Sequence, residues 1–238
     1  KQMSLGDIFR RRFGVAEQLE KIQLDPETEQ KTREYFASLK QPEDPKLKWT
    51  WDTLLEHFQM MYKEQNDVVY SGVDMPVLED LCRYFTKDIA FIPGGKRRSF
   101  DKGVLLKGGY GVGKTSIMRC FKSLGYDFGM KSTISIVQMF DEEGTAIVKM
   151  YGNKKMDFYF DDMGRETMGK FYKKEQNVMK DIFDQKYYAL KQHKIKTHIS
   201  TNMSMEKVID KYGDRMESII HDMFNIFVFD GKDKRKGL

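Results

Sequence analysis

The stretch Gly108-Gly109-Tyr110-Gly111-Val112-Gly113-Lys114-Thr115 decides the fold. It fills every required position of the phosphate-binding pattern G-x-x-x-x-G-K-[ST]. The apolar run 103–107 before it suits a buried strand, and residues 116–124 after it carry apolar side chains at helical spacing. A glycine-rich turn before a helix is the alternative interpretation, but the eight-residue pattern in this context is much more specific than a short glycine repeat.

The residue types in this loop match the chemistry of a bound nucleotide. Glycines let successive backbone N–H groups turn toward phosphate oxygens, and the helix that follows adds the positive end of its dipole. Lys114 would reach the β- and γ-phosphates, and the Thr115 hydroxyl would hold Mg²⁺. The residues predicted to bind ATP are Gly108, Gly109, Tyr110, Gly111, Val112, Gly113, Lys114, Thr115 and Ser116.

A second pattern is an apolar strand, 156–160, that ends in two carboxylates, Asp161 and Asp162. Phosphoryl transfer needs acids at the carboxyl end of a strand beside the phosphate loop. Asp161 is predicted to hold Mg²⁺ through its water shell, and Asp162 to polarise the attacking water as general base. The alternative is a strand that happens to end in an acidic turn.

A third pattern is the β-branched run 197–201, which is followed by Asn202. If this strand is parallel to the others, Asn202 emerges beside the acid pair and orients the catalytic water. The remaining expectations cover the rest of the ATPase part. They are a helix over 75–87 capped by Asp74, a strand over 132–136, a helix over 137–150, a Lys-rich helix over 170–196, helices over 205–212 and 215–224, a strand over 225–229 and a solvated basic tail over 231–238.

Alternating strands and helices predict a three-layer α/β domain over residues 71–238, with a mostly parallel sheet of five strands. Residues 1–70 are predicted to form a small helical region with a Pro-containing linker at 41–45. Its aromatic residues, including Trp49 and Trp51, suit either a partner-docking or DNA-contacting module or simply the core of a small bundle.

The charge is unevenly distributed along the chain. Residues 1–70 hold 11 basic and 13 acidic side chains, whereas residues 71–238 hold 30 and 23. The excess of positive charge in the nucleotide-binding part suits a polyanion such as DNA, and the Lys-rich segment 170–196 is the candidate surface; ordinary solubility explains such an excess almost as well.

Other features point to a cytoplasmic protein. The sequence shows no membrane-spanning run and no signal peptide. Its two cysteines, Cys82 and Cys120, lie on apolar helical faces, which favours buried thiols in a reducing compartment over a disulfide or a metal site.

Residues 74–230 resemble the AAA+ ATPases of the DnaC/IstB type, which comprise bacterial helicase loaders and transposition helper ATPases. The resemblance rests on GGYGVGKT at 108–115, FYFDDMGRE at 158–166, HISTN at 198–202 and YGDRMES at 212–218. It implies a P-loop NTPase fold of the AAA+ and ASCE class, with Walker A, Walker B and sensor 1 roles for the first three segments. The Asp-Asp-x-Gly-x-Glu form at 161–166 is specific to this branch.

The fourth segment departs from the family pattern G-x-R-x-x-S-R, in which the second arginine completes a neighbouring subunit's active site. Arg215 occupies the first arginine position, but Ile219 stands at the second. Either Arg215 takes over this catalytic role, or Arg165 or Arg235 does, or activation by a neighbour is weak. Because an arginine finger supplies a rate factor of about 10³ or more, slow hydrolysis is one of the expectations.

The resemblance implies a cytoplasmic, Mg²⁺-dependent ATPase that binds DNA, assembles on it as an ATP-stabilised oligomer and loads or remodels a replicative helicase. One alternative is a transposition helper that selects target DNA and recruits a transposase. Another is an ATP-gated scaffold with slow hydrolysis. A small-molecule kinase fits less well, because the acid pair and Asn202 suit water activation.

Overall fold

The computed structural model describes residues 49–66, 70, 74–94 and 98–234, so the expectations for residues 1–48 lie outside the described part. Its elements, in chain order, are α3 (Trp51–Asn66), α4 (Met75–Thr86), the 3₁₀ helix η3 (Ile89–Gly94), β1 (Gly103–Gly108), α5 (Lys114–Ser123), β2 (Gly129–Ser132), α6 (Thr133–Glu143), α7 (Thr145–Gly152), β3 (Phe158–Met163), β4 (Gly169–Phe171), β5 (Lys174–Gln176), α8 (Val178–His193), β6 (Thr197–Thr201), α9 (Met205–Tyr212), α10 (Arg215–Met223) and β7 (Phe224–Phe229).

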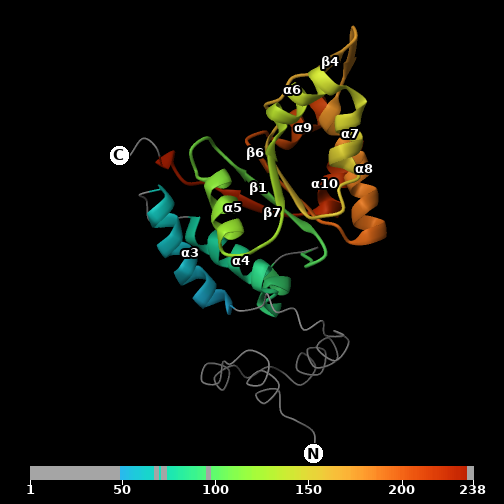
Figure 1. The fold of residues 1–238 in the computed structure, drawn as a ribbon. Helices are drawn as coiled ribbons and strands as arrows, with labels where there is room; N and C mark the ends of the chain where they lie inside the picture. Colours follow the sequence, from blue (N-terminus) through green and yellow to red (C-terminus); the bar gives the residue numbers. More distant parts are fainter. Residues whose placement is uncertain (1–48, 67–69, 71–73, 95–97, 235–238) are drawn as a thin grey trace, which may run out of the picture. The chain divides into compact units, whose positions relative to one another are not determined.

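Five of these strands form one sheet in the order β2-β3-β6-β1-β7, and every neighbouring pair is parallel. Helices α3, α4 and α5 lie on one side of this sheet, and α6, α7, α8 and α10 lie on the other (Figure 1). Buried strands with helices on both faces carry nearly continuous apolar runs, which is why β1 and the start of β3 were recognisable. The predicted three-layer α/β fold with a five-stranded parallel sheet is confirmed.

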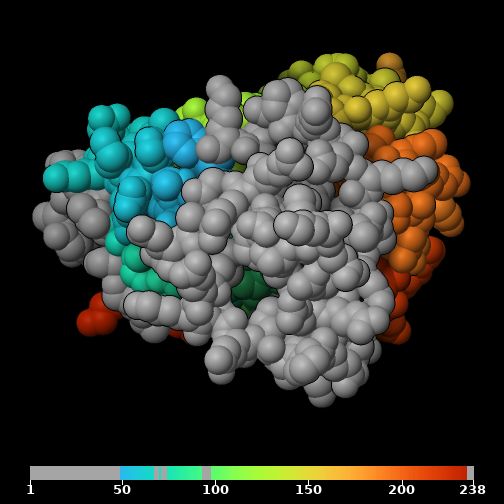
Figure 2. Space-filling model, turned by 90° about the horizontal axis from the view of Figure 1, so that it is seen from below, coloured from blue at the N-terminus to red at the C-terminus, as the bar shows by residue number. Residues whose placement is uncertain are grey.

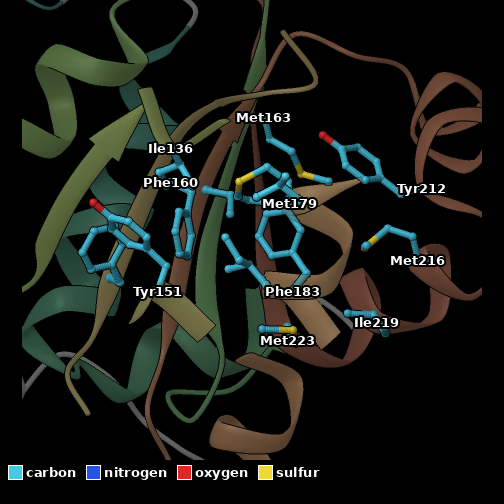
Figure 3. Packing of buried hydrophobic residues seen from close by; sticks show 14 of the residues in the cluster. Ile136, Tyr151, Phe160, Met163, Met179, Phe183, Tyr212, Met216, Ile219 and Met223 are labelled. Carbon is cyan, nitrogen blue, oxygen red and sulfur yellow. The ribbon is translucent and has the colours of Figure 1, made fainter. Parts of the chain in front are cut away.

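A cluster of buried hydrophobic residues packs β3 against α6, α7, α8 and α10. The side chain of Phe160 lies between Tyr151 of α7 and Phe183 of α8 (Figure 3). Its ring meets that of Phe183 edge-on, with centroids 5.7 Å apart. Aromatic pairs in this geometry add to the burial of apolar area, so they hold β3 in place just before its two acidic residues.

Helix α3 packs against the helix that follows the phosphate loop. The rings of Phe58 and Phe121 lie 5.1 Å apart, and the Cys120 thiol donates to the Phe58 carbonyl. The compact unit therefore begins at Trp51 and includes a helix that the sequence alone had grouped with the N-terminal region. In the space-filling view α3, in blue, and α8, in orange, lie on opposite flanks (Figure 2).

The predicted buried thiols are confirmed. Cys82 and Cys120 are both free and fully buried. Burial raises the pKa of the Cys120 thiol to about 12, so this group stays protonated and unreactive at neutral pH.

The strand expected at 132–136 is wrong. Strand β2 ends at Ser132, whose hydroxyl accepts a hydrogen bond from the Ser135 N–H and caps helix α6. A good N-cap overrides the β preference of the branched residues that follow. The single helix expected over 137–150 is instead two, α6 and α7, which are separated by Gly144 at a φ of 67°.

The helix expected over 170–196 is also only partly correct. Its first residues form the antiparallel hairpin of β4 and β5, with Tyr172 and Lys173 at positive φ in the turn. Helix α8 then begins after Asn177, whose side chain accepts from the Lys180 N–H. Lys186 faces the interior and donates to the Lys154 carbonyl at 3.1 Å, so it does not belong to the proposed basic surface.

A buried histidine makes the stability of this fold depend on pH. His198 of β6 is 2% exposed, and its Nδ1 accepts from the Val104 N–H at 3.1 Å. Burial, together with the nearby Lys196 ammonium, lowers the pKa of His198 to about 3. The imidazole is therefore neutral in the folded protein but becomes protonated in the unfolded chain below its ordinary pKa of about 6.5.

Because the unfolded state binds the extra proton, stability falls as the pH decreases from about 6.5 toward 3. We expect this group to cost about 2 kcal/mol of unfolding free energy between pH 7 and pH 5. Urea unfolding of the wild type and of His198→Gln at both pH values measures it, since glutamine can still accept from Val104 but cannot titrate. An equal loss in both proteins would exclude His198 as the cause.

Candidate nucleotide-binding site

The phosphate loop connects β1 to α5 and is held open by its glycines. Gly111 and Gly113 have φ values of 77° and 94°, in the left-handed region that favours glycine. A Cβ at Gly113 would lie 2.5 Å from the Tyr62 hydroxyl oxygen, which leaves no room for a side chain. The Tyr70 hydroxyl donates to the Val112 carbonyl at 3.0 Å. These contacts fix the backbone of the loop, which leads directly into the N-terminus of α5.

Two further residues predicted to bind ATP are Ser116 and Tyr110. Ser116 lies in the first turn of α5 and hydrogen-bonds the buried Tyr62 side chain. Burial raises the pKa of Tyr62 to about 12, although the hydrogen bond with Ser116 opposes this rise. Tyr110 projects from the loop and is 61% exposed.

The Lys114 ammonium lies within the loop itself. Its Nζ donates to the carbonyls of Gly108 and Gly109 at 2.8 and 2.7 Å, and also to Oδ1 of Asn202. Lys114 is only 6% exposed, so the positive charge is partly desolvated and held on the phosphate side of the sheet. Asn202 therefore contacts the loop lysine from the end of β6, whereas the position expected from the sequence was beside the acid pair.

Thr115 and Asp161 lie side by side. The Thr115 hydroxyl donates to the Asp161 carboxylate, with distances of 3.0 and 2.8 Å to its two oxygens. The Tyr159 and Ser200 hydroxyls donate to the same carboxylate at 2.7 and 2.6 Å. Burial and the nearby carboxylate raise the pKa of Tyr159, so its hydroxyl remains a donor. A hydroxyl beside a carboxylate suits Mg²⁺, which takes few protein ligands and prefers oxygen.

Asp162 occupies an irregular point of β3. Its φ is 59°, and the register between β3 and β6 shifts between Phe160 and Met163. Its N–H donates to the Ser200 hydroxyl at 2.9 Å, and its carbonyl accepts from the Thr133 hydroxyl at 3.0 Å. Such bulges re-aim a side chain, and here the Asp162 side chain leaves the regular alternation of the strand.

The Asp162 carboxylate pairs with Arg165, whose Nη1 lies 2.7 Å from Oδ2. Arg165 is about half exposed, so solvent screens the pair and it adds little to stability. The Asp162 carboxylate is therefore paired with a group that solvent and ligands can also reach.

The turn after the acid pair is clamped to α9 by Glu166. Oε2 of Glu166 accepts from the Gly164 N–H at 2.9 Å, and Oε1 accepts from the Tyr212 hydroxyl. Lys211 lies 3.2 Å from Oε1 and donates to the Gly164 carbonyl. A Cβ at Gly164 would overlap the Met203 sulfur. These contacts give the glycine and glutamate of Asp-Asp-x-Gly-x-Glu a structural role.

The structure brings together Lys114, Thr115, Asp161 and Asn202, and Asp162 follows Asp161 on β3, but Arg215 lies elsewhere. Arg215 begins α10, is largely exposed, and has its Nη1 3.9 Å from Oδ1 of Asp184 on α8. Ile219 is 4% exposed and belongs to the core, so packing occupies the position of the family's second arginine.

Two site residues were missed from the sequence, Tyr159 and Ser200. Strand alternation could have found Tyr159, because it lies two residues before Asp161 and so shares its face. The same rule relates Ser200 to Asn202.

The strand order and the loop geometry together decide the fold class. The fold is a three-layer α/β fold with a parallel five-stranded sheet, in which the phosphate loop joins β1 to α5. No protein-family model and no curated protein matches the chain. Among solved structures that match is the crystal structure of DnaI, with 17% sequence identity, a TM-score of 0.45, and coverage of 68% of this chain and 88% of its own.

Proposed function

We propose that this protein is a Mg²⁺-dependent ATPase. The observation that carries the proposal is that a buried lysine, a hydroxyl, a carboxylate and an amide meet at one edge of the sheet, with a second carboxylate at the next residue of the strand. These are the groups that phosphoryl transfer to water requires, namely charge compensation, a metal site and a base.

Each side chain has a distinct task in this proposal. The Lys114 ammonium binds phosphate oxygens in exchange for the carbonyls of Gly108 and Gly109. Thr115 and Asp161 hold Mg²⁺, which would supply charge neutralisation on the phosphates. Asp162 accepts the proton of the attacking water at its carboxylate, and Asn202 orients that water or senses the terminal phosphate.

We extend the proposal to an ATPase that binds DNA, assembles on it as an oligomer and loads a replicative helicase. The excess of positive charge in residues 71–238 supports a polyanion partner, and the Asp-Asp-x-Gly-x-Glu segment supports the helicase-loader branch. The transposition helper and the slow ATP-gated scaffold are the competing roles. Within the described residues, no helix is long and apolar enough to span a bilayer. A cytoplasmic location is part of the proposal, since the proposed DNA and helicase partners would be met there.

Assembly tests this wider proposal. We expect the particle mass, measured by light scattering after size exclusion, to rise well above the 28.1 kDa of one chain only when ATP, Mg²⁺ and DNA are all present. ATP placed between subunits would link them, and DNA would align them. Lys114→Ala, which should not bind ATP tightly, is the control and should stay a monomer.

The preferred DNA form and the turnover number separate the competing roles. Steady-state hydrolysis that DNA stimulates supports the remodelling enzyme, whereas a single round of turnover supports the scaffold. A monomer under every condition would contradict the oligomeric ATPase.

A further inference from the structure

The chain after β7 turns back onto the phosphate loop. The Lys234 N–H donates to the Gly111 carbonyl at 3.0 Å. The Asp233 carboxylate lies directly against Gly111, because a Cβ added there would overlap it. The expected solvated tail over 231–238 is therefore wrong for residues 231–234, the part that the structure describes.

The segment 230–234 is anchored at its start by a buried acid. Asp74, 2% exposed, accepts at Oδ1 from the N–H groups of Asp230 and Gly231, each at 3.0 Å. The sequence predicted Asp74 as the N-cap of α4, but its side chain makes no cap hydrogen bond there and holds this segment instead. Gly231 is required at the contact, since a Cβ would lie 2.1 Å from the Asp74 carboxylate.

At the other end the segment is held by an aromatic ring. The Lys234 ammonium lies 2.9 Å from the centroid of Tyr70, the residue whose hydroxyl supports the loop at Val112. Its Nζ is buried and has no hydrogen-bond partner among the described residues. Burial lowers the pKa of Lys234 to about 8. The Lys234 ammonium makes no hydrogen bond to a described residue and would regain its hydration if the segment left the Tyr70 ring. This contact is therefore weaker than the two hydrogen bonds at Asp74.

A carboxylate against the loop is electrostatically opposed to a bound nucleotide. The loop and the start of α5 attract anions, and Asp233 places one there from within the chain. A nucleotide brings several negative charges to the same loop, and like charges in a partly desolvated site repel strongly. The two anions therefore compete.

We propose that residues 231–234 form an autoinhibitory strap, in which Asp233 competes with nucleotide for the phosphate loop and nucleotide binding displaces the segment. This inference rests on the proposed nucleotide site. Binding and strap position are then coupled reciprocally, so loosening the strap tightens nucleotide binding.

Asp233→Asn tests the competition in the full chain. We expect it to bind fluorescent methylanthraniloyl-ADP about five- to tenfold more tightly than the wild type, which is within the usual range of such couplings. Asp230→Asn is the matched control, because it removes the same charge from an exposed position three residues earlier and should leave the affinity unchanged.

Two results would overturn the proposed strap. One is an Asp233→Asn variant that binds the nucleotide no more tightly than the wild type does. The other is an Asp230→Asn variant whose affinity rises as much as that of Asp233→Asn. Absence of nucleotide binding in all three proteins would overturn the proposed nucleotide site as well, so the two failures are distinguishable.

Limited proteolysis reports on the strap without measuring affinity. Trypsin cleavage after Lys232 and Lys234, followed by mass spectrometry, should speed up when nucleotide is added to the wild type. Lys114→Ala should show no such acceleration. Protection of these bonds by nucleotide would mean that the segment closes over the ligand, which contradicts the proposal.

Discussion

Lys114→Ala is expected to abolish tight nucleotide binding. The ammonium it removes is 6% exposed and lies among the carbonyls of Gly108 and Gly109, beside the N-terminus of α5. Charge-assisted hydrogen bonds contribute about 1.5–3 kcal/mol each, so losing those to the phosphates should weaken binding by about a hundredfold or more. Calorimetric titration with a non-hydrolysable ATP analogue and Mg²⁺ measures the loss.

Lys107→Ala is a matched control for this experiment. Lys107 lies near the end of β1, the strand that leads into the phosphate loop, but it lines an apolar groove with Met203, Met205 and Val228. It should bind nucleotide as the wild type does. Unchanged affinity in Lys114→Ala would contradict the phosphate-loop assignment, and equal losses in both variants would indicate a general charge effect.

The parts of the fold that were predictable are those with a strong local pattern. Strands β1, β3 and β7 are mostly apolar runs, β6 is a β-branched run, and the loop has a motif whose spacing is set by backbone geometry. Strand β2 has no such pattern. It is the short edge segment Gly129–Ser132 with no fully buried residue, so the branched residues after it attracted the strand prediction.

Other features could not be predicted because they depend on contacts between residues far apart in the sequence. Glu166 meets Tyr212 across 46 residues, and Asp74 meets Gly231 across 157. Neither partner has a periodicity that points to the other, and the sequence assigned Asp74 a local role as a helix cap. The acid pair and Asn202 were predictable because parallel strands bring their carboxyl ends to one edge, whereas the strap depends on where the chain turns after β7.

Asp162→Asn is expected to preserve nucleotide binding and to stop hydrolysis. The amide has the shape of the carboxylate but cannot accept a proton from water, and general base catalysis typically contributes about 10²–10⁴ in rate. The backbone of Asp162 should keep its position, because its contacts with Ser200 and Thr133 use main-chain groups. Single-turnover phosphate release measures the rate, and analogue titration checks the affinity.

The ion pair of Asp162 with Arg165 needs its own control, because the substitution removes that pair too. Arg165→Gln breaks the pair and leaves the carboxylate, so it should retain turnover within about tenfold if Asp162 acts as a base. A loss in Arg165→Gln as large as that in Asp162→Asn would assign the effect to the pair and make Arg165 the group that acts on the terminal phosphate. Wild-type turnover in Asp162→Asn would exclude Asp162 as the base. Asp161, which accepts hydrogen bonds from the hydroxyls of Thr115, Tyr159 and Ser200, would then be the next candidate.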